Sequence, residues 1–452
     1  MNIHLIEHGY INVAYFANSM RYFEINTATK ALINDYLNRD LSDQDVADIH
    51  GLSMTDYKAF INTLQEYDHP VSIRTIELED NKLNRLVMNI SNRCNLKCKY
   101  CYANGGSYCS EEDYMSVETA KIAIDEIYKK YKIINNLQLF GGEPTLNMKV
   151  ASFILKYVTE KYEAGLITKL PAFSMVTNGI ILTDEFIRLV KQYKLKITVS
   201  FDGDPKVNDE MRIFEDSTGT SKVIMRNIKR LKLLTGQPEV IEATYNKKHV
   251  EHNVSIADII NFIHNELGDI NLHIVPVSGD ENFPYTLSDY SPFVDSVDDL
   301  FIAIQNKKAM TYTVFSRLIN NLNNKSPNQY LCDAGFGTLS VSTKGDIYPC
   351  FMFTDNKKYQ MGTIDSFMTA DKDLFAAVQD RFYDFNKYRL PSCENCFAKS
   401  LCFGCLGINE IENEDIEKAH VNNCEMYKEM IERIIIDIVK AKNNVEIKLS
   451  AA

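Results

Sequence analysis

The chain has 452 residues, 45% of them hydrophobic and 24% charged, a composition typical of a soluble globular protein with two or three domains. Its formal net charge of −12 argues against nucleic acid as a partner, because phosphate binding needs clustered Lys and Arg. The sequence lacks an uncharged apolar run of about 18 residues and an N-terminal basic segment followed by an apolar core, so it predicts neither a membrane span nor a signal peptide. We therefore expect a cytoplasmic protein.

Residues 1–75 predict a small N-terminal domain, followed by a linker at 76–84. Its short strand-like runs are Ile3–Ile6, Ile11–Phe16 and Arg21–Ile25. Three helical patterns follow near Thr27–Leu37, Ser42–Ile49 and Met54–Gln65, and Ser42 and Ser53 are suitable helix caps. This order of elements is that of a winged-helix module. The alternative is a plain extension that packs on the next domain.

Strands and helices alternate over residues 85–310. The strand candidates are Leu86–Ile90, Leu137–Phe140, Phe173–Thr177, Lys196–Phe201, Val240–Tyr245 and Leu272–Pro276, and amphipathic helical patterns separate them. Six such units predict an α/β fold, a parallel sheet curved into a partial (β/α)6 barrel. Ligand sites in such folds lie at the carboxyl ends of the strands.

The first predicted strand runs into a cysteine motif, Cys94-x3-Cys98-x2-Cys101. Three thiolates on one tight loop can hold three irons of a 4Fe–4S cluster and leave the fourth iron open to a small molecule. Zinc is the alternative, although it normally takes four protein ligands. The motif, including Tyr100, resembles the radical S-adenosylmethionine (SAM) signature. The resemblance implies that SAM chelates the open iron and that its reductive cleavage gives a 5′-deoxyadenosyl radical.

Further motifs at successive strand ends resemble the same family. Gly141-Gly142-Glu143 resembles its GGE motif, and Thr177-Asn178 ends the third strand. The stretch from Ser200 and Asp202 to Arg212 resembles the family's S-x-D-G…D-x-x-R pattern. The resemblance implies that Glu143 accepts bonds from the methionine ammonium, that Ser200 and Asp202 lie near the ribose and carboxylate, and that Arg212 pairs with the carboxylate. Each residue taken alone also fits a turn, a cap or a surface ion pair.

Seven more cysteines lie between residues 332 and 424, within a second cofactor region predicted at 325–442 and closed by a helix near Met426–Lys440. The pattern resembles the SPASM domain of peptide-modifying radical enzymes, which holds two auxiliary 4Fe–4S clusters, for three clusters in all. By this resemblance the outer cluster would take Cys393, Cys396, Cys402 and Cys424. The inner cluster would take Cys332, Cys350 and Cys405. The inner cluster is then one ligand short, so its fourth iron is open or recruits Cys109. A zinc ribbon is the alternative for this region.

The N-terminal unit resembles the RiPP recognition element, which binds the leader of a ribosomally synthesised precursor peptide as a strand added to a sheet edge. The edge expected here is Arg21–Ile25, facing the helix around Tyr57–Leu64. Together the three parts resemble sactipeptide and ranthipeptide thioether synthases, which implies a Cys-rich precursor and an electron donor such as flavodoxin or ferredoxin as partners. A carbon–carbon cross-linking maturase, an anaerobic sulfatase-maturing enzyme and a zinc-stabilised peptide-binding scaffold remain alternatives. The sequence identifies no general base.

Overall fold

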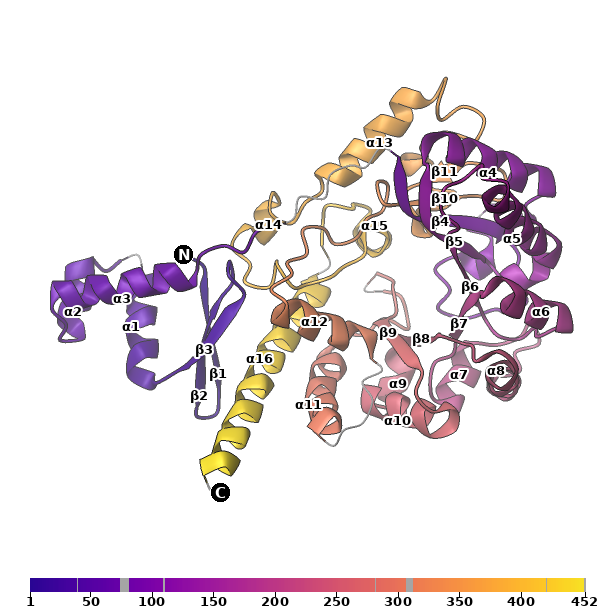
Figure 1. Cartoon of the computed structure of the whole chain (residues 1–452). Coiled ribbons are helices and arrows are strands. Elements are labelled where there is room, and N and C mark those ends of the chain that lie inside the picture. The colour runs from indigo at the N-terminus through magenta and orange to yellow at the C-terminus, as the bar shows by residue number, and fades with distance from the viewer. Residues whose placement is uncertain are drawn as a thin grey trace.

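The computed structural model describes residues 1–38, 40–73, 81–108, 110–280, 282–305, 312–419 and 421–450. Figure 1 shows a small N-terminal unit at one end, a curved sheet with its helices at the other, and the C-terminal part running between them. No helix in these ranges is both long enough and apolar enough to cross a membrane.

The N-terminal unit is a three-stranded antiparallel sheet followed by three helices. The strands are β1 (Ile3–His8), β2 (Ile11–Phe16) and β3 (Arg21–Ile25), in that spatial order, and the helices are α1 (Thr27–Leu37), α2 (Asp43–Ile49) and α3 (Met54–Tyr67). Alternating residues of β2 divide the sheet into two faces. Phe16 packs with Ile33 and Leu64 of the helices, whereas Tyr15 belongs to the main core of the protein. The sheet therefore lies between its own helices and the rest of the chain.

Six parallel strands form the barrel part of the protein. They are β4 (Lys82–Ser91), β5 (Ile133–Gly141), β6 (Ala172–Thr177), β7 (Lys196–Ser200), β8 (Val240–Tyr245) and β9 (Asn271–Pro276). The helices between and after them are α4 (Val117–Lys130), α5 (Met148–Glu163), α6 (Asp184–Tyr193), α7 (Pro205–Met211), α8 (Ser221–Thr235), α9 (Lys247–Glu251), α10 (Ile256–Leu267) and α11 (Ser291–Gln305). The predicted α/β fold with a parallel sheet is confirmed.

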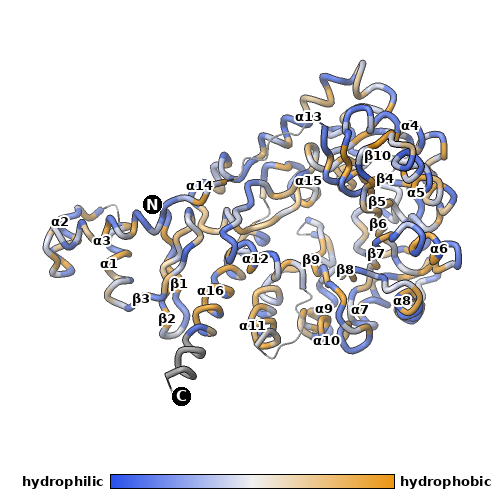
Figure 2. Tube along the Cα trace, viewed as in Figure 1, coloured by the Kyte–Doolittle hydropathy of each residue, from blue (hydrophilic) through white to orange (hydrophobic). Residues whose placement is uncertain are grey.

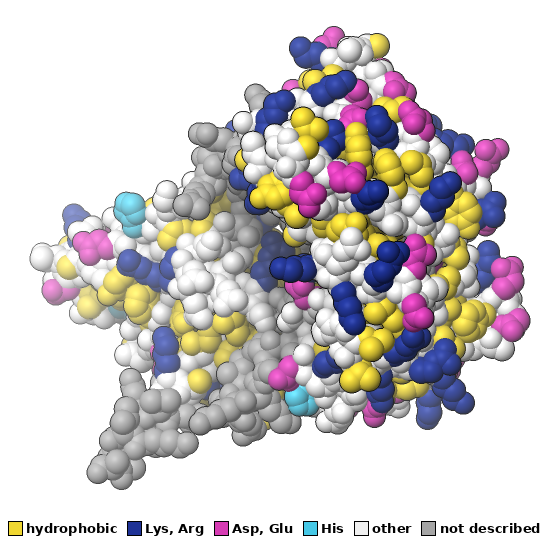
Figure 3. All heavy atoms as spheres, turned by 45° about the vertical axis from the view of Figure 1, so that its right-hand side comes forward, with side chains coloured by type: hydrophobic (Ala, Val, Ile, Leu, Met, Phe, Trp, Pro, Cys, Tyr) yellow, Lys and Arg dark blue, Asp and Glu magenta, His cyan; other side chains and the backbone are white. Residues whose placement is uncertain are grey.

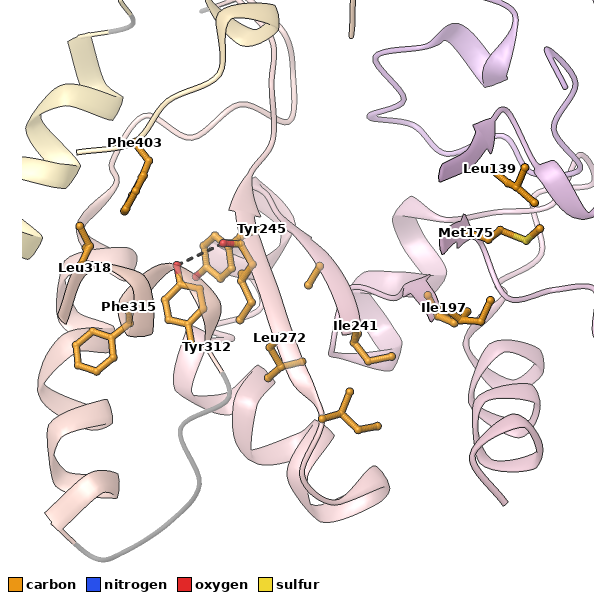
Figure 4. Close-up of a cluster of buried hydrophobic side chains, with 14 of the residues drawn as sticks. Leu139, Met175, Ile197, Ile241, Tyr245, Leu272, Tyr312, Phe315, Leu318 and Phe403 are labelled. Carbon is orange, nitrogen blue, oxygen red and sulfur yellow. Dashed lines mark hydrogen bonds between the residues drawn. The ribbon is translucent and has the colours of Figure 1, made fainter. Parts of the chain in front are cut away.

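The barrel strands bury every second side chain under the helices. Leu139, Met175, Ile197, Ile241 and Leu272 make up much of this layer, which Figure 4 shows continuing towards α12. Side chains on the opposite, concave face are half-buried and many are polar; they include Gln138, Ser174, Thr198, Ser200, Thr244 and His273. The inside of the barrel is therefore suited to a polar ligand.

The C-terminal part adds two strands to the same sheet. Strand β10 (Thr338–Val341) pairs in parallel with β4, and β11 (Ile347–Tyr348) pairs with β10, giving the order β11-β10-β4-β5-β6-β7-β8-β9. The helices here are α12 (Thr313–Asn323), α13 (Lys372–Asp384), α14 (Pro391–Glu394), α15 (Leu406–Asn413) and α16 (Val421–Ser450). Short 3-10 turns lie at Asn104–Gly106, Pro144–Asn147, Phe351–Phe353 and Lys357–Tyr359. The sheet thus crosses the boundary predicted at residue 325.

Helix α16 joins the three parts of the molecule. Hydrophobic residues recur along α11 and α16 (Figure 2), and the two helices pack together through side chains such as Val297 and Ile434. At the small sheet, Glu432 of α16 contacts His4 of β1. The helix predicted near Met426–Lys440 is present and extends beyond both of those ends.

Candidate active site

The three cysteines Cys94, Cys98 and Cys101 lie, half-buried, on the loop that follows β4. Backbone bonds fix this loop to the segment after α7: the Lys97 amide donates to Ile213 O (2.8 Å) and the Lys99 amide donates to Met211 O (2.9 Å). Burial raises the pKa of Cys94 to about 12 and that of Cys98 to about 11. These thiols are therefore poor nucleophiles by themselves, whereas a bound metal would stabilise the thiolates.

The glycine pair at the end of β5 allows the cysteine loop to approach closely. The Gly142 amide donates to Ser91 O (2.7 Å), and a Cβ atom at Gly142 would lie 2.4 Å from Arg93 O. At Gly141 φ is +133°, and a Cβ atom would lie 2.2 Å from Ser91 O. Both glycines are thus required by contact between backbone segments.

Glu143 connects the ends of β5 and β6. Its Oε1 accepts hydrogen bonds from the Thr145 amide (3.0 Å), the Thr145 hydroxyl (2.6 Å) and the Thr177 hydroxyl (2.7 Å). Its Oε2 accepts a bond from the Asn178 amide (2.7 Å). Burial raises the pKa of Glu143, and these donors act in the opposite direction. A carboxylate held in this way keeps spare acceptor capacity on Oε2 for a cationic group of a ligand.

Asn178 links the third strand end to the cysteine loop. Its side-chain amide donates to Asn95 Oδ1 (2.8 Å) and lies 3.7 Å from the Cys94 sulfur. Sequence analysis did not single out Asn95. Ser200, the last residue of β7, is half-buried. Glu143, whose amide donates to Arg93 O, and Asn178 therefore both contact the cysteine loop.

Tyr100, Asp202 and Arg212 form one buried group. The Tyr100 hydroxyl lies 2.7 Å from both carboxylate oxygens of Asp202, and Arg212 Nη1 donates to the Tyr100 oxygen (2.8 Å). His249 supports this group, because its Nδ1 accepts a bond from the Asn246 amide (3.1 Å) and its Nε2 therefore donates to the Asp202 carbonyl oxygen (2.9 Å). Sequence analysis missed His249, which carries no motif. The Tyr100 side chain thus connects the cysteine loop to Asp202 after β7, and His249 after β8 supports Asp202 in turn.

Electrostatic interactions among the C-terminal thiols divide them into two groups. Burial raises the pKa of Cys350, and the nearby Cys405 and Cys332 thiols raise it further. Burial raises the pKa of Cys424 to about 11, with further contributions from Cys402, Cys393 and Cys396. One group therefore holds three described thiols and the other holds four. Cys109, the suggested extra ligand, lies outside the described residues.

The donor atoms of these two groups fit iron–sulfur clusters. In a 4Fe–4S cube each cysteine thiolate binds a different iron, and four thiolates are the usual ligand set. Cys393, Cys396, Cys402 and Cys424 supply such a set of donor atoms.

Cations lie beside both groups of thiols, and one of them is fully buried. Lys387 is fully buried, and its Nζ donates to Cys402 O (2.8 Å) and lies 3.7 Å from Cys402 Sγ. Arg85 lowers the pKa of Cys350 and Cys405, although burial raises both more strongly. A buried cation requires a compensating negative charge. Anionic clusters in these positions would supply it.

A curved parallel sheet with three thiols on the loop after its first strand defines an iron–sulfur enzyme fold. Residues 88–240 match the model of the Radical SAM superfamily, so the chain contains a radical SAM domain. This family implies a 4Fe–4S cluster at the three-cysteine motif.

The relatives include maturases of ribosomally made peptides and maturases of sulfatases. The chain is 25% identical over 373 residues to the radical SAM cyclopropyl synthase TigE of Paramaledivibacter caminithermalis, covering 76% of this chain and 72% of the relative. It is 25% identical to a cysteine-type anaerobic sulfatase-maturating enzyme of Clostridium novyi, with 72% and 87% covered. It is 24% identical to the subtilosin biosynthesis protein AlbA of Bacillus subtilis, with 69% and 66% covered. The protein is a radical SAM enzyme related to peptide maturases and to anaerobic sulfatase maturases.

Solved structures show the same fold. Native anSMEcpe with bound AdoMet superposes with a TM-score of 0.67 at 19% identity and covers 80% of this chain and all of its own. SuiB of Streptococcus suis bound to the precursor peptide SuiA superposes with a TM-score of 0.52 at 13% identity and covers 94% of this chain and 98% of its own. The SuiB match therefore covers a larger share of this chain than the anSMEcpe match does.

Proposed function

We propose that this protein is a maturase of a ribosomally synthesised, Cys-containing peptide and forms thioether cross-links in it. The observation that carries the proposal is the division of the C-terminal thiols into a group of four and a group of three. A cluster on the four-thiol group is fully ligated and suits electron transfer. A cluster on the three described thiols leaves one iron for a further ligand, and a substrate thiolate is a good ligand for such an iron.

When bound, the SAM and its cluster supply a 5′-deoxyadenosyl radical, which removes a hydrogen atom from carbon. The residues at the strand ends bind and orient this cofactor. Glu143 offers Oε2 to the methionine ammonium. Tyr100 and Arg212 are held together by a hydrogen bond and place polar groups beside Cys98. The polar concave face of the barrel accommodates the peptide segment that is modified.

Thioether formation removes two hydrogens from the peptide. One leaves as a hydrogen atom taken from the acceptor carbon. The other leaves the Cys thiol as a proton when sulfur bonds to that carbon, and the remaining electron would be accepted by an iron–sulfur cluster held by the C-terminal thiols. A cluster held by Cys332, Cys350 and Cys405 would also supply an iron that keeps the substrate thiol deprotonated and positioned. An external donor such as flavodoxin or ferredoxin would reduce the first cluster for each new cycle.

The N-terminal unit is proposed to bind the precursor leader. Strand β3 is an edge of its sheet, and an extended peptide can add to such an edge through main-chain hydrogen bonds. The helix segment expected opposite this edge meets it at its Leu64 end, where Leu64 clusters with Ile25 of β3. Tyr57 is buried among α1 and α2 and bonds Asp43, whereas Tyr67 contacts Phe23 of β3 at 4.5 Å between ring centroids. The surface proposed for the leader therefore comprises β3 and the end of α3.

Anaerobic reconstitution with the peptide encoded beside the gene tests this function. The modified peptide is expected to lose two hydrogens per cross-link and one alkylatable thiol for each Cys joined, as read by mass spectrometry after thiol alkylation. A Cys→Ser precursor should remain unmodified. Loss of hydrogens with every thiol still alkylatable would overturn thioether formation. Zinc in place of iron and sulfide would favour a peptide-binding scaffold.

Carbon–carbon bond formation is the second candidate, because one relative is named a cyclopropyl synthase. Such a product loses the same two hydrogens but keeps its thiols. The alkylation experiment therefore separates the two reactions. A sulfatase-derived Cys peptide tests the third possibility, suggested by the Clostridium novyi relative. Its oxidation at rates equal to those on the precursor would favour sulfatase maturation.

A further inference from the structure

Three cations converge at the start of strand β3. Arg21 is the first residue of the strand, Lys325 follows α12, and Lys442 lies on α16. The ammonium groups of Lys325 and Lys442 lie 5.3 Å and 5.0 Å from the centre of the Tyr22 ring. The Lys325 ammonium also donates to the Met20 carbonyl oxygen. Residues from three distant parts of the chain thus place positive charge beside one edge strand.

This positive charge has no carboxylate partner. Within the described residues, no Asp or Glu oxygen lies within 4.0 Å of the charged nitrogens of Arg21, Lys325 or Lys442. Burial lowers the pKa of Lys325 to about 8, and repulsion from Arg21 and Lys442 acts in the same direction. Elsewhere in the same unit, Lys30 pairs with Glu7. On the face of the molecule shown in Figure 3, basic and acidic side chains are interspersed. An uncompensated cationic group is notable in a chain of net charge −12.

The two faces of β3 have different surroundings. Tyr22 pairs with Tyr15 across the sheet and faces the C-terminal part, where the lysines lie. Phe23 faces the helices, and its ring lies 4.5 Å from Tyr67 and 5.9 Å from Phe16 between centroids. Side chains of an added strand would alternate between these two surroundings. A residue beside Tyr22 would meet ammonium groups, whereas a residue beside Glu24, further along the same side, would meet a carboxylate. Residues on the Phe23 side would meet aromatic rings.

We propose that the edge of β3, with Arg21, Lys325 and Lys442, binds an extended precursor segment in which an acidic residue stands next to an apolar one. The proposal rests on the leader-binding role given to this unit above and specifies the chemistry of its ligand. Main-chain bonds hold the segment to β3. The cations select Asp or Glu at the position beside Tyr22, and Phe23 with Tyr67 selects an apolar residue at the neighbouring position.

A random-peptide display selection on the anaerobically purified full-length protein tests this. Peptides enriched by the wild type are expected to carry an acidic residue next to an apolar one. The double variant Lys325→Glu/Lys442→Glu should enrich basic residues there instead. It should also bind the wild-type peptides at least ~10-fold more weakly by fluorescence anisotropy, the loss expected for one charge-assisted contact. The control Lys149→Glu/Lys156→Glu makes the same change of charge on the outer barrel helix α5 and should leave affinity unchanged.

The outcomes separate this inference from the leader-binding proposal. Lys442 is exposed, so Lys442→Glu alone keeps the test valid if the double variant does not fold. Enriched peptides that lose affinity in Phe23→Asp but show no preference for acidic residues would overturn the charge inference and leave leader binding in place. If Phe23→Asp weakens none of the enriched peptides, or none are enriched, both proposals are wrong.

Discussion

The His4 imidazole stacks on the Phe397 ring, with 3.6 Å between ring centroids and 4° between ring planes. His4 belongs to the N-terminal sheet, and Phe397 follows Cys396 of the four-thiol group. The buried ring of Tyr15 packs edge-on against Phe397 as well. The N-terminal unit is therefore docked on the segment that carries the outer cysteines, and changes to one are expected to affect the other.

We predict that His4→Ala lowers the free energy of unfolding by about 0.5–1.5 kcal/mol through loss of the stacked ring. Chemical denaturation of the anaerobic holoenzyme measures this, with the exposed His8→Ala as the control.

Deletion of residues 1–75 should uncover core residues and reduce iron at the four-thiol group, while the SAM cleavage at the first cluster remains. If the truncated protein holds as much iron as the full chain and modifies precursor normally, the N-terminal unit has neither role.

Replacing Cys94, Cys98 and Cys101 together with Ala should remove about four of roughly twelve irons and all SAM cleavage. The reason is that these thiols alone ligate the cluster that binds SAM. Iron analysis and 5′-deoxyadenosine release measure the two effects. The corresponding Cys393, Cys396 and Cys402 variant should also lose about four irons but keep uncoupled cleavage. Cleavage that survives in the first variant would contradict the assignment of the radical site.

Tyr100→Phe removes the hydroxyl that lies between Asp202 and Arg212. Both partners are buried, so each loses a hydrogen bond without gaining water, at a cost of about 1–3 kcal/mol. We expect SAM affinity to fall by ~10-fold or more, as measured by equilibrium dialysis. Tyr162→Phe, on an exposed ring, is the matched control. Unchanged affinity with lowered stability would assign Tyr100 a structural role alone.

Lys387→Met should make the reduction potential of the cluster proposed at the four-thiol group more negative. A buried ammonium near Cys402 stabilises the reduced cluster, which carries one more negative charge than the oxidised one. A tenfold change in the ratio of reduced to oxidised cluster corresponds to about 59 mV, the shift we expect as a minimum. Redox titration followed by EPR measures it. Lys428→Met removes a more exposed charge that already pairs with Glu425 and should shift the potential less. Equal shifts in both variants would exclude a special role for Lys387.

Affinity for an acidic peptide should decrease as pH rises through about 8. Free Lys325 loses its proton in that range because burial, Arg21 and Lys442 lower its pKa from 10.5. A bound carboxylate restores the charged form, so binding above pH 8 requires proton uptake. Anisotropy titrations at several pH values measure this, and Lys325→Met should abolish the dependence.

In the free protein, the free energy of unfolding should rise with pH between about 8 and 10.5, because the unfolded chain binds the Lys325 proton more tightly than the folded chain does.

The regular parts of the fold could be predicted from the sequence because their signals are local. The alternation of β8 and the helical period of α1 gave the observed bounds. Strand β10 could not be predicted in this way, since it has four residues and its place depends on pairing with β4. Within the site, Arg212 was expected at the SAM carboxylate, and the structure shows its bond to Tyr100. That bond, like the burial of Lys387, depends on residues far apart in the chain, and no motif marks it.

The pairing of β10 with β4 also constrains how the protein is made. Val87 of β4 pairs with Ser340, about 250 residues later in the chain. Until β10 has been synthesised, one side of β4 stays an open template for unrelated strands. Closing so long a loop is slow, and partly made chains with unpaired edges tend to aggregate. We therefore expect versions that stop before residue 338 to be insoluble when expressed, even though they contain the whole three-cysteine motif. Yield of soluble protein from a series of truncations is the direct measure.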